Sequence, residues 1–419
     1  TIPQLMARLL QYSSFSLCFH SIIVVTVLGS IPKLILSSTL YSDIQVLRTL
    51  KRSVDPSSIS PTSYLTTWDF IVDPCESTGK QFLGIVCSIP LDNTSAPSRI
   101  IAIDLDSVGY DGFLSPSIGN LTELTTLSLN RNKFRRTIPE SISNLKKLTR
   151  LSLADNCLTG TIPTEITLFK NLEYLDISGN LLTGSIPTNI TRLRSLAYLS
   201  FSSNSFTGTI PDLAGLWQLE TLDLSSNQLF GNLPHFPTRL KTLLLNSNIL
   251  SGHISRVKML NDLRRLDLSD NRFSGHISKD IVSLPRLVHL NVSMNRFTAI
   301  GTRNFSREET QLQVLDAEKN NLHGRLPINL TTIQNLDTIN LAHNQLAGPL
   351  PREYGKKLEN SWRVLYLDHN FLSGNVSQEF IVHAPRIEGS LSKNCLRCPM
   401  STTLCRGGQR SASECIQVQ

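Results

Sequence analysis

The stretch LTRLSLADNCLTGTIP at residues 148–163 returns, little changed, as LEYLDISGNLLTGSIP at residues 172–187, one period of 24 residues later. The first stretch contains the phrase LxxLxLxxN, and the second repeats it with Ile177 in place of the third leucine. The asparagine of this phrase recurs at intervals of 21–26 residues, at Asn132, Asn156, Asn180, Asn204, Asn227, Asn248, Asn271, Asn295, Asn320, Asn344 and Asn370. Val108 stands one period before Asn132, so about twelve repeats of roughly 24 residues fill residues 100–378.

Each column of the repeat has a physical reason. Leucine pairs such as Leu127/Leu129 and Leu151/Leu153 alternate with polar residues, which predicts a short strand with one buried face. Stacked turns would pair these strands into a parallel sheet, at about 4.8 Å per strand. The asparagine amide both donates and accepts, so a column of asparagines can satisfy backbone groups in the turns that burial would leave unpaired. A single repeat cannot bury its leucine face alone, so the predicted fold is an α/β repeat solenoid with a cap at each end.

Composition narrows the function classes. The 419 residues are 40% hydrophobic and 17% charged, which argues against a disordered chain or a coiled coil. The net charge is +7, but the charges are scattered and aromatics make up only 6%, so we expect no nucleic-acid partner. The basic excess fits contact with an acidic polymer, and it fits an ordinary solvated surface equally well.

The first residues have the pattern of an export signal. Arg8 follows Met6, an apolar run spans residues 22–28, and small residues occupy positions 37–39. We therefore expect a cleaved secretory signal peptide over residues 1–40. A membrane anchor is the competing interpretation, but His20 and the Pro-Lys pair at 32–33 interrupt the stretch. We find no other span long enough to cross a bilayer, so the mature chain is expected to have none.

The phrases LTGTIP (158–163) and LTGSIP (182–187) resemble the plant-specific extracellular class of leucine-rich repeats. Leu65-x-x-Trp68, Asp73-Pro74-Cys75 and Gly84-Ile85-Val86-Cys87 resemble the N-terminal cap of that class, although Phe82-Leu83 replaces its usual tryptophan. The resemblance covers roughly residues 41–380. It implies a right-handed superhelix with a concave parallel sheet, a cap at 41–99, an array at 100–378 and a Cys-rich cap and tail at 379–419. This scaffold serves receptor ectodomains, co-receptors and secreted inhibitors alike, so it does not fix the function.

The cysteines fit an exported solenoid. Cys75 and Cys87 flank the N-terminal cap and should form a disulfide in an oxidising compartment. Four more lie beyond the last repeat, and they would form a zinc site in a cytosolic protein or two cap disulfides in an exported one: Cys395, Cys398, Cys405 and Cys415. Export favours disulfides, with three pairings open. Cys18 lies in the leader. Cys157 is left over as a free thiol, unless it bonds another molecule.

Seven sequons of the form Asn-x-Ser/Thr are candidates for glycosylation if the chain is exported. They lie at Asn93, Asn120, Asn189, Asn291, Asn304, Asn329 and Asn375. Asn291 stands between Leu290 and Val292, so its side chain should point out of the concave sheet, where a glycan would close off the face.

No catalytic signature is present: the sequence contains no GxSxG, HExxH, phosphate loop or kinase motif. We therefore expect no enzyme and no cofactor. His289, His343 and His369 fall on the concave side of different repeats, and we expect solvated surface histidines there and no metal site.

The concave face is the expected binding surface. Six positions before successive asparagines stand Arg150, Tyr174 and Tyr198, with Glu173 beside them and Arg265 farther along. Tyrosine and arginine are the residue types that most often anchor interfaces. A second cluster near the C-terminal end contains His343, Arg363, Tyr366 and His369. Aspartates recur four positions before the asparagine, and we interpret them as part of the scaffold.

The resulting hypothesis is an exported, glycosylated protein that binds a receptor ectodomain as a receptor-like partner or co-receptor. The alternative is a secreted inhibitor of pectin-degrading enzymes, similar to the polygalacturonase-inhibiting proteins, whose partner would be a wall hydrolase. The longer array and the Cys395-x-x-Cys398 tail depart from that family's pattern. A third hypothesis is a wall-associated protein held on acidic wall polysaccharide by its positive charge.

Overall fold

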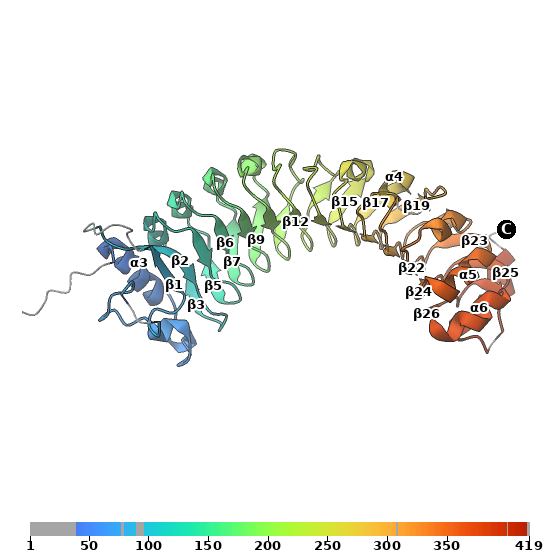
Figure 1. Ribbon diagram of the computed structural model, residues 1–419, viewed down its shortest axis with the longest axis horizontal. Helices are drawn as coiled ribbons and strands as arrows, with labels where there is room; N and C mark the ends of the chain where they lie inside the picture. The colour runs from blue at the N-terminus through green and yellow to red at the C-terminus, as the bar shows by residue number, and fades with distance from the viewer. Residues whose placement is uncertain (1–38, 77–78, 89–95, 307–308, 400, 417–419) are drawn as a thin grey trace, which may run out of the picture. The chain divides into compact units, whose positions relative to one another are not determined.

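The structure is a computed structural model that describes residues 39–76, 79–88, 96–306, 309–399 and 401–416. Residues 1–38 of the predicted leader, with Cys18, and the sequon at Asn93 lie outside the described residues. The unit from Thr39 onward is compact, and its repeats follow one another from β1 and β2 to β24 and β26 (Figure 1).

The main sheet has fourteen strands over the described residues, and all of them are parallel except the first. Adjacent turns are in register, with Leu127 opposite Leu151 and Leu151 opposite Leu175. This confirms the predicted parallel sheet. The strands are β1 (Ile85–Ser88), β2 (Arg99–Asp104), β4 (Thr126–Ser128), β6 (Arg150–Ser152), β8 (Tyr174–Asp176), β10 (Tyr198–Ser200), β12 (Thr221–Asp223), β14 (Thr242–Leu244), β16 (Arg265–Asp267), β18 (His289–Asn291), β20 (Val314–Asp316), β22 (Thr338–Asn340), β24 (Val364–Tyr366) and β26 (Glu388–Ser390).

We call the recurring asparagine at the end of each LxxLxLxxN phrase the ladder asparagine. Three smaller parallel sheets run along the part of each turn that follows it. The first contains β3 (Asp111–Phe113), β5 (Lys133–Arg136), β7 (Cys157–Thr161), β9 (Leu181–Ser185) and β11 (Ser205–Thr207). The second contains β13 (Phe230–Gly231), β15 (Ile249–Gly252), β17 (Arg272–Ile277) and β19 (Arg296–Ile300). The third contains β21 (His323–Gly324), β23 (Gln345–Pro349), β25 (Phe371–Asn375) and β27 (Cys395–Arg397).

Short helices complete many of the turns. Several begin directly after an apolar-Pro pair, as η4 does after Pro139 and η5 after Pro163. They are η3 (Pro116–Asn120), η4 (Glu140–Asn144), η5 (Thr164–Leu168), η6 (Thr188–Arg192), η7 (Ser255–Met259), α4 (Lys279–Val282), η8 (Ile328–Thr332), α5 (Arg352–Asn360), α6 (Gln378–His383), η9 (Ala384–Arg386), η10 (Thr403–Cys405) and α7 (Ala412–Ile416). Over the described part of the chain, none of the helices combines the length and the hydrophobicity that crossing a membrane requires.

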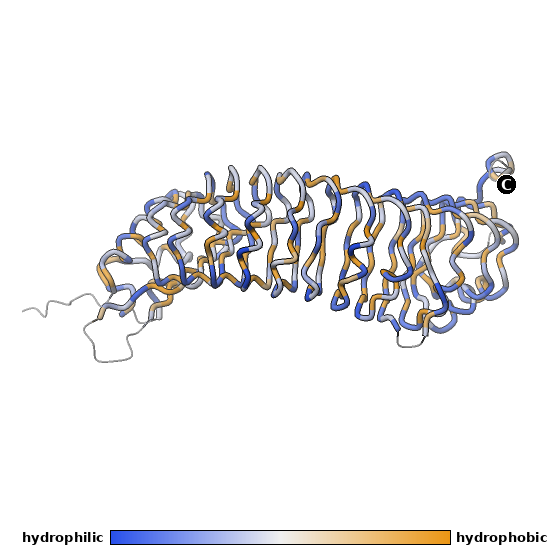
Figure 2. The backbone as a smooth tube through the Cα atoms, turned by 90° about the horizontal axis from the view of Figure 1, so that it is seen from above, coloured by the Kyte–Doolittle hydropathy of each residue, from blue (hydrophilic) through white to orange (hydrophobic). Residues whose placement is uncertain are grey.

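The leucine columns form one continuous core. Leu127, Leu151 and Leu175 are 0% exposed, and the partner Leu153 is 2% exposed. Hydrophobic and hydrophilic segments alternate along every turn of the backbone (Figure 2). Each turn therefore buries its leucines against the turns on either side, as the repeat pattern predicts.

The ladder asparagines connect consecutive turns through their side chains. Asn156 Nδ2 donates to the carbonyl of Leu153 in its own turn at 3.1 Å and to that of Leu129 in the preceding turn at 2.9 Å. Its Oδ1 accepts from the backbone N–H of Phe134 at 2.9 Å. These buried bonds satisfy backbone groups that neither strand nor helix pairs, which confirms the role expected for the column.

The N-terminal cap covers the first edge of the sheet. It contains α3 (Tyr41–Arg52), η1 (Pro56–Ser58), η2 (Tyr64–Thr67) and β1. Cys75 is bonded to Cys87, as expected, and the buried Trp68 ring stacks on Phe82, which fills the place of the usual tryptophan. Thr39 is 2% exposed and forms a β-bridge with Ser98, so the cap includes residues that the sequence analysis assigned to the leader.

The ladder continues one turn beyond the twelve that we counted. β26 adds a strand, and Asn394 Nδ2 donates to the carbonyl of Leu367 at 2.9 Å. The tail then supplies backbone acceptors where a further turn would stand: Leu391 N–H donates to Leu404 at 2.6 Å, and Lys393 N–H donates to Gly408 at 2.7 Å. The disulfide pairs are Cys395–Cys415 and Cys398–Cys405.

Candidate functional site

The strand residues six positions before each ladder asparagine form one row across the main sheet. The register places Thr126, Arg150, Tyr174, Tyr198 and Thr221 on successive strands, opposite one another. Residues that are 23 or 24 positions apart in the sequence therefore lie side by side on the concave face.

Three of these predicted residues form a stack, which we call the tyrosine platform: Arg150, Tyr174 and Tyr198. The Tyr174 and Tyr198 rings are 4.3 Å apart between centroids, with 6° between their planes. The Arg150 guanidinium carbon lies 3.6 Å from the Tyr174 ring centroid, a cation–π contact on the other face of that ring. The stack therefore continues unbroken across β6, β8 and β10.

The surroundings hold the platform in place. The Tyr174 hydroxyl donates to Asp176 Oδ2 at 3.2 Å, and Asp176 is almost fully buried. Burial, together with the nearby Asp176 carboxylate, raises the pKa of Tyr174, and the same two causes raise the pKa of Tyr198. Both phenols are therefore neutral at physiological pH.

Two other predicted residues lie outside this stack. Glu173 is exposed at the position before β8, beside the platform. Arg265 is exposed on β16, and β12 and β14 separate it from Tyr198. Arg265 instead pairs in register with His289, where burial and the Arg265 charge lower the histidine pKa.

The aspartate column has a structural function, as we interpreted it. Asp176 Oδ1 accepts from the backbone N–H of Ser178 at 3.0 Å and from its hydroxyl at 2.6 Å. Asp223 and Asp267 make the same pair of bonds two residues ahead. These carboxylates hold the turn that leads into the ladder asparagine.

The second predicted cluster divides into two parts. The Tyr366 hydroxyl donates to Glu388 Oε1 at 3.0 Å, and this bond raises the Tyr366 pKa, while Arg363 is exposed one residue before β24. His343 and His369 come together in the neighbouring turns, where their rings stack with centroids 4.0 Å apart.

This pairing corrects our treatment of the histidines as separate surface residues. His343 and His369 each precede a ladder asparagine by one residue, so adjacent turns place them side by side. Sequence reasoning also missed Asp368, whose Oδ2 lies 2.7 Å from His369 Nδ1 and 4.0 Å from His343 Nε2. A signal was available, because the dipeptide His-Asn ends both phrases. Burial and the neighbouring His369 lower the pKa of His343.

The predicted glycosylation sites differ in exposure. Asn120, Asn189, Asn304 and Asn375 are exposed, whereas Asn329 is half-buried. Asn291 is also half-buried on β18, where its Oδ1 accepts from the Ser293 N–H at 3.1 Å and its hydroxyl at 2.8 Å. A glycan on Asn291 would be attached through Nδ2, which lies 3.4 Å from Asp267 Oδ2, and it would leave the two bonds to Oδ1 in place. Cys157 is an exposed free thiol at the start of β7.

Comparisons with known proteins agree with this architecture. Family models described as "Leucine rich repeat" match residues 122–182, 170–229 and 262–284. Receptor-like protein 13 of Arabidopsis thaliana is 30% identical over 141 residues, which is 28% of this chain and 13% of that protein.

Two solved structures share the fold over most of the chain. The crystal structure of PEPR1–AtPEP1 aligns with a TM-score of 0.68 at 26% identity, over 85% of this chain and 52% of that one. The ectodomain of the receptor kinase GASSHO1/SCHENGEN3 from Arabidopsis thaliana, in complex with CASPARIAN STRIP INTEGRITY FACTOR 2, aligns with a TM-score of 0.62 at 25% identity. That alignment covers 84% of this chain and 47% of the ectodomain. The chain thus spans about half the length of these receptor structures.

Proposed function

Because the chain is a plant-type leucine-rich repeat protein, a distant relative of receptor-like proteins and receptor ectodomains, we propose that it binds a protein or peptide outside the cell. In this proposal it acts as a receptor-like partner or co-receptor, and the concave face around the tyrosine platform is the contact surface. The stack of Arg150, Tyr174 and Tyr198 is the observation that carries the proposal.

The chemistry of the platform supports a protein partner. Tyrosine and arginine are enriched at the centres of interfaces, where they combine a large apolar area with hydrogen-bonding groups. The rings are already stacked and Tyr174 is tied to Asp176, so few side-chain rotamers remain to be fixed on binding. Preorganisation of this kind lowers the entropic cost of association.

The neighbouring positions leave the platform accessible. Along the same row, the flanking strands carry only threonines, at Thr126, Thr221 and Thr242. On the adjacent column, Ser152 and Ser200 are small and buried. The platform therefore projects above a floor of short polar side chains, and a partner segment laid along the sheet would meet it first.

The test is affinity capture from plant extracellular fluid with the purified chain from residue 39 onward, followed by direct binding measurements on each captured protein. We expect receptor ectodomains among the captured proteins. Tyr174→Ala combined with Tyr198→Ala should weaken their binding by about 2 kcal/mol or more, roughly 30-fold, if the platform is a hot spot.

The matched control is Thr221→Ala combined with Thr242→Ala, which alters the same row on the next two strands, β12 and β14. This pair should bind within about threefold of wild type, since threonine is rarely a hot spot. Wild-type affinity in the tyrosine double variant, with unchanged thermal unfolding, would remove the platform from the interface. Capture of wall hydrolases alone would instead support the inhibitor function, and release of the chain from walls by salt alone would support polysaccharide attachment.

A further inference from the structure

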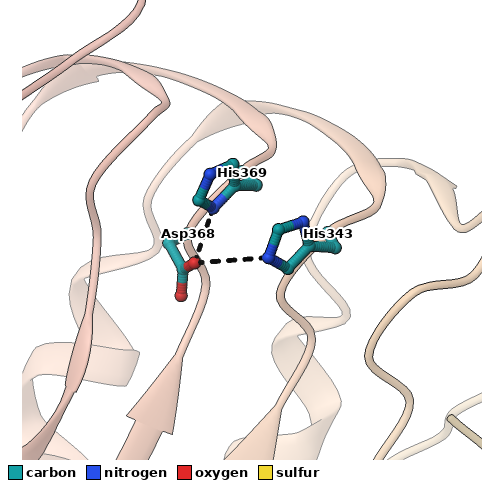
Figure 3. Close-up of side chains that lie close together, drawn as sticks. All are labelled: His343, Asp368 and His369. Carbon is teal, nitrogen blue, oxygen red and sulfur yellow. Dashed lines mark hydrogen bonds and ion pairs between the residues drawn. The ribbon is translucent and has the colours of Figure 1, made fainter.

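Adjacent turns near the C-terminal end bring three metal-ligating side chains together: His343, Asp368 and His369 (Figure 3). His343 lies three residues after β22, and His369 lies three residues after β24. The asparagine that follows each histidine is buried and bonded to the turn before it, as Asn370 Nδ2 is to the Leu341 carbonyl at 2.9 Å. The ladder therefore fixes both histidine backbones at equivalent places in neighbouring turns.

Both imidazole rings direct a nitrogen at the same carboxylate. His369 Nδ1 lies 2.7 Å from Asp368 Oδ2, and His343 Nε2 lies 4.0 Å from the same oxygen. The ring planes differ by 12°. One ligand atom from each residue lies within 4.8 Å of the other two. The view in Figure 3 shows the two rings side by side with the carboxylate between their nitrogens.

We propose that His343 Nε2, His369 Nδ1 and the Asp368 carboxylate form a binding site for a divalent transition metal of the zinc class. Two imidazoles and one carboxylate are a common ligand set for Zn²⁺, at bond lengths of about 2.0–2.2 Å. Tetrahedral geometry at those bond lengths sets neighbouring ligand atoms roughly 3.3 Å apart. The ligand atoms in the structure lie between 2.7 and 4.8 Å apart, so side-chain rotations that change these separations by up to about 1.5 Å would bring them onto an ion.

The donor set favours this class of ion. Ca²⁺ and Mg²⁺ take six or more oxygen ligands, whereas this cluster offers one carboxylate and two nitrogens. Lysines stand at the histidine position in the two flanking turns, Lys319 and Lys393, and the Lys319 ammonium is paired with Glu318 at 3.1 Å. Asp368 is the one carboxylate of the cluster, so it supplies the negative charge next to a bound cation.

Three protein ligands leave one tetrahedral position for water or for a group from a partner. The histidine side chains are each about 40% exposed, so that position is open to solvent. The cluster lies in the turns that follow β22 and β24, and strands β12 to β20 separate it from the tyrosine platform. The metal site thus stands independently of the proposed binding function.

Isothermal titration of ZnCl₂ into the purified chain tests the proposal, with Co²⁺ as a spectroscopic probe of tetrahedral coordination. The chain carries Cys157→Ser, to remove the exposed thiol, and an affinity tag without histidines. We expect one equivalent of Zn²⁺ to bind, with visible Co²⁺ absorption bands. His343→Ala, His369→Ala and Asp368→Asn should each weaken binding at least tenfold.

His289→Ala is the matched control, since it removes another histidine of the main sheet outside the cluster. It should bind zinc as tightly as the parent chain. A parent chain without Zn²⁺ heat or Co²⁺ bands would overturn the proposal and leave a hydrogen-bonded His-Asp pair only. If all three cluster variants bound zinc as tightly as the parent chain, the proposal would also be overturned. Asp368→Asn preserves the size and shape of the side chain. If its metal-free unfolding midpoint equals that of the parent, weaker zinc binding reflects the lost ligand and not misfolding.

Discussion

Replacing one ladder asparagine should measure what holds consecutive turns together. In Asn156→Ala, the backbone N–H of Phe134 loses the acceptor that lies 2.9 Å away in the structure. The three carbonyls that Asn156 Nδ2 contacts keep a second donor. Leu129 retains Asn132, Leu153 retains Asn180, and Ala154 retains the Arg131 N–H.

The expected loss of stability follows from this contrast: the Phe134 N–H loses its acceptor, whereas the three carbonyls each keep another donor. One buried N–H without a partner costs about 1–3 kcal/mol, and each additional lost hydrogen bond costs about 1 kcal/mol or less when the carbonyl keeps another donor. We expect Asn156→Ala to lower the free energy of unfolding by about 2–4 kcal/mol. Asn156→Asp should be at least as damaging at neutral pH, because its carboxylate would face three carbonyl oxygens.

The assay is urea unfolding followed by circular dichroism, with Asn144→Ala as the matched control. Asn144 is exposed at the end of η4, so its removal should change the free energy of unfolding by less than about 0.5 kcal/mol. If Asn156→Ala were as stable as Asn144→Ala, the side-chain ladder would not be a source of stability, and leucine packing and the backbone hydrogen bonds of the sheets would hold the turns together.

Further predictions concern the core, the C-terminal cap and a buried phenol. Leu151→Ala, at a fully buried position, should lower the free energy of unfolding in urea by about 2–5 kcal/mol. Leu168→Ala, at a site 45% exposed, should lower it by less than about 1 kcal/mol. Equal losses in the two variants would contradict the register of the repeat. Non-reducing peptide mapping should recover Cys395–Cys415 and Cys398–Cys405, and replacing the first pair by serines should lower stability by about 3 kcal/mol; any other pairing would show that the cap is closed differently. Burial and the hydrogen bond to Asp106 raise the pKa of Tyr110 to about 12, so the neutral phenol stabilises the folded state below the unfolded pKa of about 10 and this stability is lost as the pH rises toward 12. Between pH 9 and 11.5 the free energy of unfolding should therefore fall less with pH in Tyr110→Phe than in wild type. Equal pH slopes in the two proteins would refute this assignment.

Much of the fold followed from a few residue types at fixed spacing. The leucine pairs predicted the strands, and the asparagines predicted the turns, because each has one physical function that the repeat imposes. The thirteenth strand of the parallel array escaped detection because Gly389 stands where the other turns carry leucine. A Cβ at Gly389 would lie 1.9 Å from the Leu365 carbonyl oxygen. The two backbones approach so closely that this position has no room for a leucine, and the repeat pattern is therefore missing here.

The candidate sites were predictable to different degrees. Arg150, Tyr174 and Tyr198 share one column, and the register of a parallel sheet makes column neighbours into contacts. His343 and His369 also share a column, since each directly precedes a ladder asparagine, but the sequence does not show that both rings turn toward Asp368. The pairing of the four C-terminal cysteines depends on how the tail crosses the last turn, which spacing alone does not determine.

The closed C-terminal edge has a consequence for self-association. A parallel sheet with a free last strand presents unpaired backbone donors, and a second molecule could dock on them end to end. Here Leu404, Gly408 and the carbonyl of Asn394, which accepts from the Arg410 N–H at 2.7 Å, occupy those hydrogen-bonding positions. The two disulfides fasten the tail that supplies them. Reducing both disulfides would free the tail to leave β26, and the edge of that strand would then be open to pairing with a second molecule.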